Sequence, residues 1–119
     1  MKIRIKGNSL RYRLTKTDVE NFGRDGYLEE TSNFGTQVFK YALKRTAAEI
    51  LTAGFSDNTI TVYMPFSMAD EWTATDRVGF ENNSGQMHLL IEKDFKCLDN
   101  VAEDQSDNYP NPLSLKMQA

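Results

Sequence analysis

Apolar and polar positions alternate along much of the chain, which predicts a mainly β protein. Lys2 to Lys6 alternates charged with apolar residues, and Leu10, Tyr12 and Leu14 continue the two-residue period. In a strand, this period places the apolar side chains on one face. We expect strands at about 2–6, 9–15, 27–32, 37–45, 48–56, 58–64, 77–82 and 86–95, with short helices at about 17–23 and 67–74.

Turn and cap signals mark where these segments begin and end. Pro65 ends a strand because proline cannot donate to a ladder. Two pairs have the spacing of a capping box at a helix start, namely Thr17 with Glu20 and Ser67 with Asp70. The remaining turn signals are Gly7-Asn8, Asp57-Asn58, Asn33-Phe34-Gly35, Asn83-Ser84-Gly85, and Gly23 or Gly26 at the end of the first helix.

The same order of elements recurs after a shift of 50 residues, with no gap needed. In this alignment Phe22 falls on Trp72, so both aromatics take the same place in a helix and are expected in the core. In the hairpins, Leu28 falls on Val78, Gly35 on Gly85, Phe39 on Leu89 and Tyr41 on Ile91. We therefore interpret the chain as two tandem units, each a strand, a short helix and a hairpin.

The 119 residues are expected to form a single domain. Unit one covers about 2–45, unit two about 52–95, and an acidic C-terminal tail about 97–119. A unit of this length is too small to hold a core alone. Two units interlocked in one closed sheet would solve that problem and remove exposed strand edges.

Charge is distributed unevenly along the chain, whose formal net charge is −3. Residues 2–45 carry ten bases and five acids, whereas residues 52–95 carry two bases and seven acids. One interpretation is a solvated surface with a solubilising tail. The other is a cationic patch for phosphates or for an acidic partner, which the acidic tail could mask.

Few residues offer catalytic or metal-binding chemistry. The chain has one histidine, His88, and one cysteine, Cys97, which argues against a Cys/His zinc site, and Cys97 has no adjacent base. We predict no catalytic residue, metal or cofactor. There is no apolar run of membrane-spanning length and no signal-peptide pattern, so we expect a cytoplasmic protein without a membrane partner.

The segment Lys6-Gly7-Asn8-Ser9-Leu10, followed by Arg13-Leu14 and Lys16, resembles the opening of the AbrB/MazE superfamily. Thr15 stands where that pattern has proline, and Pro65 stands at the matching place in unit two. The superfamily forms a swapped-hairpin β-barrel from two chains. The resemblance therefore implies a single-chain, pseudo-two-fold swapped-hairpin β-barrel.

The same resemblance implies a DNA-contacting strand. Carried over by position, its candidates are Lys6, Asn8, Ser9, Arg11, Arg13 and Lys16. Unit two does not follow, because its matching positions for the four cations are uncharged, and a two-fold DNA reader needs both halves basic. A DNA-binding regulator or antitoxin is therefore the alternative hypothesis.

The whole chain also resembles a group of short bacterial proteins of unknown function, through its KGNS-x-RYRL opening and EDQSDNYPNP end. The leading hypothesis is a non-enzymatic binding module that combines the basic strand face with the acidic tail. Its partner would be another protein, a second copy or a small anion. An unidentified enzyme is a third and weaker hypothesis.

The tail itself has three interpretations: it occupies a partner, it folds over the basic strand, or it packs back on the domain. The last is preferred. The candidate tail residues are Asp99, Glu103, Asp104, Asp107 and Tyr109.

Overall fold

The computed structural model describes residues 1–95 and 106–110, and these contain eight strands and two helices. The first half has two strands, a helix and two strands, and the second half repeats that order. The prediction of a mainly β protein with two short helices is confirmed. The elements are β1 (Lys2–Lys6), β2 (Ser9–Leu14), α1 (Lys16–Asp25), β3 (Tyr27–Asn33), β4 (Val38–Thr46), β5 (Thr52–Ser56), β6 (Thr59–Pro65), α2 (Phe66–Ala74), β7 (Gly79–Asn82) and β8 (His88–Lys93).

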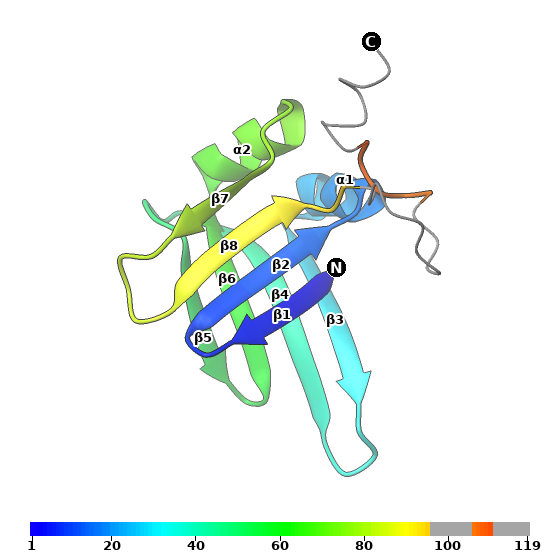
Figure 1. Cartoon of the computed structure of the whole chain (residues 1–119), viewed down its shortest axis with the longest axis vertical. Coiled ribbons are helices and arrows are strands. Elements are labelled where there is room, and N and C mark those ends of the chain that lie inside the picture. The colour runs from blue at the N-terminus through cyan, green and yellow to red at the C-terminus, as the bar shows by residue number, and fades with distance from the viewer. Residues whose placement is uncertain (96–105, 111–119) are drawn as a thin grey trace.

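The strands form two four-stranded sheets, and each sheet combines strands from both halves of the chain (Figure 1). The first sheet has the order β1-β2-β8-β7, and the second has the order β3-β4-β6-β5. The central contacts, β2 with β8 and β4 with β6, are parallel, whereas all the others are antiparallel. Each half therefore contributes its last two strands, a hairpin, to the sheet that contains the first two strands of the other half.

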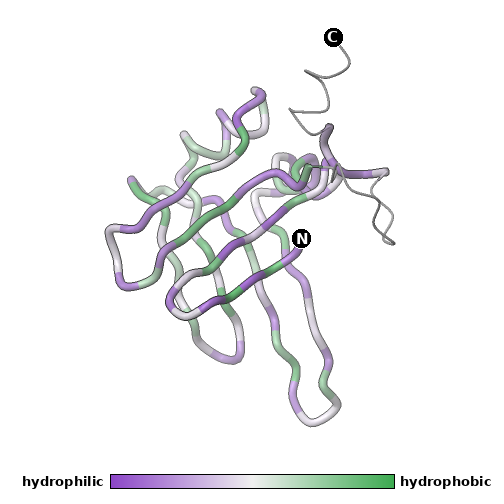
Figure 2. Tube along the Cα trace, in the orientation of Figure 1, coloured by the Kyte–Doolittle hydropathy of each residue, from purple (hydrophilic) through white to green (hydrophobic). Residues whose placement is uncertain are grey.

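The core lies between the inner faces of the two sheets and is closed at one end by the helices (Figure 1). The expected alternation is found along β2, where Leu10, Tyr12 and Leu14 are buried and their neighbours are not. Figure 2 shows hydrophilic and hydrophobic stretches interleaved along the strands. Phe22 of α1 and Trp72 of α2 are fully buried and meet edge-on, with ring centroids 6.1 Å apart. Burying side chains of this size contributes roughly 2–3 kcal/mol each. Their predicted place in the core is confirmed.

The two hairpins do not follow the ungapped shift that holds for β1, β2 and α1. Leu28 pairs with Leu43 in one hairpin, and Phe80 pairs with Ile91 in the other. The shift of 50 sets Tyr12 on Val62, and their parallel partners are Ile91 and Leu43, so Ile91 takes the place of Leu43. Phe80, not Val78, therefore takes the place of Leu28, and the second hairpin is four residues shorter between matching positions. The predicted hairpin alignment was wrong because a shift of two residues leaves every side chain on the same face.

The sheets do not close into the predicted barrel. Within residues 1–95 and 106–110, no backbone ladder joins an edge of one sheet to an edge of the other. Where the edges approach, the Met1 ammonium lies 3.1 Å from Glu30 Oε1, and Asn82 Nδ2 donates to the Leu51 carbonyl at 2.8 Å. At these places a side chain and the chain's amino group bridge the two sheets, where a closed barrel would have a backbone ladder.

The N-cap of helix α1 lies two residues before Thr17, the first residue of the predicted capping box. Its N-cap is Thr15, whose hydroxyl accepts from the Asp18 amide at 3.2 Å while the Asp18 carboxylate accepts from the Thr15 amide at 3.1 Å. Gly26, at φ 70°, is the C-cap, which decides between the two predicted glycine stops. Pro65 occupies the N-cap of α2 without a side-chain bond, so the Ser67 capping box was also wrong.

Neither helix in the described part of the chain combines the length and the apolar character needed to cross a membrane.

Candidate functional site

The outer face of the β1–β2 hairpin gathers most of the predicted cations. Strand pairing sets Lys2 beside Arg13, Arg4 beside Arg11, and Lys6 beside Ser9. The side chains of β2 that alternate with its buried residues point outward, so all six belong to one face. A shallow hollow of about 160 Å³ on this face is lined by Lys2, Ile3, Arg4, Arg11 and Arg13.

Strand β8 and the residue that follows it bring two acids against the arginines of β2. Glu92 pairs with the Arg11 guanidinium, and Asp94 Oδ1 lies 3.0 Å from Arg13 Nη2. Asp94 is only 2% exposed, and its other oxygen lies 3.1 Å from Lys2 Nζ. Three of the five cations on this face, Lys2, Arg11 and Arg13, are therefore paired with acids within the molecule. Neither acid is predictable from the sequence, because only the parallel pairing of β2 with β8 places them there.

Arg4 and Lys6 differ from the arginines of β2. Within residues 1–95 and 106–110, neither makes an ion pair within 4 Å. Both are exposed, and both lie toward the turn at Gly7-Asn8. They are the cations of this face that remain available to an outside anion.

Two predicted site residues lie away from this face. Asn8 is in the turn, where its carbonyl accepts from the His88 amide at 2.8 Å and ties the hairpin to β8. Lys16 is the first residue of α1, and its ammonium lies 5.9 Å from the centre of the Tyr109 ring. The structure therefore brings together Lys6, Ser9, Arg11 and Arg13, and separates Lys16 from them.

The described part of the tail, residues 106–110, packs at the beginning of α1. Asp107 Oδ1 accepts from the Thr17 hydroxyl at 3.0 Å, and its backbone carbonyl accepts from the Lys16 amide at 3.1 Å. Hydrogen bonds from Thr15 and Thr17 hold the pKa of Asp107 below its usual value. A carboxylate is favoured here because the helix N-terminus carries free N–H groups and a partial positive charge.

Tyr109 anchors the same segment on the other side. Its amide donates to the Asp94 carbonyl at 2.8 Å, and its ring contacts Phe95 at a centroid distance of 5.7 Å. The ring also lies 5.3 Å from the Lys93 ammonium, and burial lowers the pKa of Lys93. These contacts are those expected of a tail that packs back on the domain. Asp99, Glu103 and Asp104, the other predicted tail residues, lie outside the described residues.

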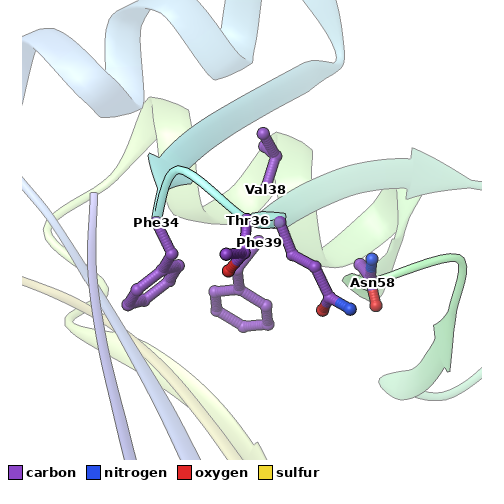
Figure 3. A pocket seen from close by; sticks show the side chains of 6 residues that line it. Phe34, Thr36, Val38, Phe39 and Asn58 are labelled. Carbon is purple, nitrogen blue, oxygen red and sulfur yellow. The ribbon is translucent and has the colours of Figure 1, made fainter.

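The inner faces of the sheets leave apolar surface uncovered at the end opposite the helices. One groove of about 300 Å³ is lined by Ile5, Leu10, Ala53, Gly54, Phe55, Ile60 and Met87. A second hollow of about 400 Å³ lies at the β3–β4 hairpin, where Phe34 and Phe39 project to the same side (Figure 3). Exposed apolar surface of this kind is typical of an interaction site.

Other chemistry is sparse in the described residues. No group of three His, Cys, Asp or Glu side chains among them is placed to hold a metal ion. His88 Nε2 lies 2.9 Å from Glu81 Oε2, and both side chains are exposed. Cys97 lies outside the described residues.

A family model described as a family of unknown function, DUF7009, matches residues 1–113. The chain belongs to DUF7009. No curated protein and no solved structure matches it. The predicted membership of an uncharacterised family is therefore confirmed. For this DUF7009 chain, the bacterial origin and the AbrB/MazE relationship stay predictions.

Proposed function

We propose that this DUF7009 chain is a non-enzymatic binding module whose β1–β2 face takes an anionic partner. One observation carries the proposal: a hairpin of this geometry forms without cations on its outward face. The matching strands β5 and β6 form the same hairpin, in the same register, with uncharged residues at the corresponding outward positions. These positions are Thr52, Gly54, Ser56, Thr61 and Tyr63.

The ion pairs with Glu92 and Asp94 separate the cations of this face into two groups, those already paired with an acid and those available to an outside anion. Arg11 and Arg13 are held in place by Glu92 and Asp94, so an anion that recruits them must compete with carboxylates already present. Arg4 and Lys6 carry no such cost. They supply the attraction, whereas the arginines of β2 supply a fixed polar surface beside them.

The AbrB/MazE relationship is supported by the exchange of hairpins between the two halves. In that case the anionic partner would be DNA. The uncharged β5–β6 face argues against it, because a two-fold DNA site presents two equivalent basic surfaces. An acidic protein is therefore the partner that we propose, and DNA is an outcome of the test.

The test is fluorescence anisotropy with two labelled probes, an acidic peptide of alternating glutamate and glycine and a random DNA duplex. We expect Arg4→Ala/Lys6→Ala to weaken peptide binding roughly tenfold at low salt, with a smaller loss near physiological salt. The matched control is Arg24→Ala/Lys44→Ala, which removes the same charges from exposed positions elsewhere.

Equal losses in both double variants would refute the proposed face. DNA binding that is tighter than peptide binding, steeply salt-dependent and lost with Arg4 and Lys6 would favour the regulator hypothesis instead.

A further inference from the structure

The first sheet ends at β1, and the outer edge of this strand pairs with no other strand in the described residues. The two-residue turn makes Lys6 and Ser9 the first hydrogen-bonded pair of the hairpin. Antiparallel alternation then turns the backbone N–H and C=O groups of Ile3 and Ile5 away from β2. Within residues 1–95 and 106–110, no hydrogen bond from elsewhere reaches those groups.

We infer that this edge binds an extended segment of a partner protein in which acidic and apolar residues alternate. The segment would add a fifth strand beside β1. The inference rests on the proposed function, because Arg4 and Lys6 serve both. Beyond that function, it specifies that the partner segment is an extended strand and that its acidic and apolar side chains alternate.

The outer side of β1 sets the acidic positions. Lys2, Arg4 and Lys6 face outward in succession. A directly opposed residue on an added strand lies about 4.5–5.5 Å away and shares that face, so opposite charges attract and like charges repel. Edge lysines commonly protect a sheet from uncontrolled pairing. Here they exclude a second copy of β1 and admit an acidic strand.

The inner side of β1 sets the apolar positions. Ile5 faces inward but is 52% exposed, and Phe55 across the groove is 67% exposed. With Ile60 and Met87 they line the groove of about 300 Å³. An added strand lies on the side of β1 away from β2, so its inward side chains would pack beside Ile5 at the margin of this groove and remove part of its apolar lining from water.

The β3–β4 hairpin extends the apolar surface beyond β1. Tyr41 donates its hydroxyl hydrogen to the Met1 carbonyl at 2.9 Å, which fixes the start of β1 over the inner face of β4. From Tyr41 the ring contacts continue to Phe39 at 6.1 Å, and Phe34 beyond it is 71% exposed (Figure 3). The β7–β8 hairpin is shorter, and β5 lacks the cations. Among the described residues, only the β1 edge combines outward cations with a neighbouring exposed apolar surface.

The first experiment compares two labelled peptides of about eight residues with the same composition. One alternates glutamate and valine, and the other places all its glutamates before its valines. Only the alternating peptide puts its charges on one face of a strand and its apolar groups on the other. We expect it to bind the full chain at least roughly tenfold more tightly than the block peptide.

The second experiment locates the backbone contact. Amide hydrogen exchange should slow at Ile3 and Ile5 when the alternating peptide binds, whereas Arg4, already bonded to β2, should change little. Two peptides methylated on alternate backbone nitrogens, one on the odd positions and one on the even positions, should differ. The peptide whose methyl groups replace the N–H groups facing β1 should not bind, whereas the other should still bind. The variant Ile5→Pro removes an outward N–H without removing a bond to β2, and should weaken binding similarly.

The outcomes separate the inference from the function on which it rests. If both peptides bind equally, and both are weakened by Arg4→Ala/Lys6→Ala, the face binds anions but the added strand is refuted. If neither peptide responds to that double variant, the proposed function fails as well. Slowed exchange at Phe55 instead of Ile5 would place the partner on β5 and overturn the inference.

Discussion

Asp94 is the acid on which the basic face depends most, and its removal tests the electrostatic argument directly. The side chain is 2% exposed, with Arg13 Nη2 at 3.0 Å and Lys2 Nζ at 3.1 Å. Asp94→Asn keeps the size of the side chain but removes its charge. The two cations then lose a common counterion, and the native state should be less stable.

The expected loss follows from the burial of the three groups. Hydrogen bonds to charged groups contribute about 1.5–3 kcal/mol each, and removal of one partner of a buried pair costs about 3–5 kcal/mol. Lys2 is 49% exposed and Arg13 is 36% exposed, so water recovers part of that loss. We therefore expect about 2 kcal/mol, or a Tm lowered by about 8 °C for a domain of this length.

Urea unfolding measures the change, with the slope of the transition as a check that only stability has altered. Asp25→Asn is the matched control, because Asp25 pairs with Arg24 on the exposed surface and should contribute little. In the same variant of Asp94, the acidic peptide should bind roughly threefold more tightly at low salt, because the face loses one negative charge. An unchanged urea midpoint would refute the assignment of Asp94 as a stabilising counterion.

Two further predictions concern a glycine and the tail. A Cβ at Gly79 would lie 2.1 Å from the Ile91 carbonyl oxygen, so Gly79→Ala should lower the free energy of unfolding in urea by more than about 3 kcal/mol. The control is Gly85→Ala, because a Cβ at Gly85 would meet no atom within 4 Å. Equal effects of the two substitutions would contradict the close approach at Gly79. Because the pKa of Asp107 is lowered in the folded chain, its carboxylate stabilises the fold at neutral pH, and this contribution is lost as pH falls through that lowered value. Asp107→Asn should therefore lower Tm at about pH 7 but not at about pH 2. A difference in Tm between the variant and the wild type that persists at about pH 2 would show that the charge on Asp107, with its bond from Thr17, is not the source of the stabilisation.

Local patterns were sufficient where the structure depends on neighbours along the chain. The two-residue period located β2 and β6 within a residue or two, and the turn pair Asp57-Asn58 adopts the positive φ angles of a tight hairpin turn. The first capping box was misplaced because two Ser/Thr-x-x-acid pairs, Thr15 with Asp18 and Thr17 with Glu20, overlap at the start of α1. Only the connection from β2 shows that Thr15, not Thr17, is the N-cap.

The candidate site was predictable in its cations and not in its counterions. Lys6, Arg11 and Arg13 share a face because alternation dictates it. Arg11 meets Glu92 only because β8 lies parallel to β2, a contact between residues 81 positions apart. Nothing in the local sequence distinguishes these neutralised arginines from Arg4, which has no acid beside it in the described part of the chain.

The sequence by itself determined the strands, the helices, the buried aromatics Phe22 and Trp72, and the imbalance of charge between the halves. These follow from periodicity and composition, which act over a few residues. The tertiary structure decided the pairing of β2 with β8, the two-residue displacement of the hairpins and the separation of the sheets. Those features depend on contacts between distant segments, and a displacement by two residues preserves the pattern of buried and exposed positions. The open edge of β1 is a consequence of that assembly, because only the positions of the other strands leave it without a neighbour.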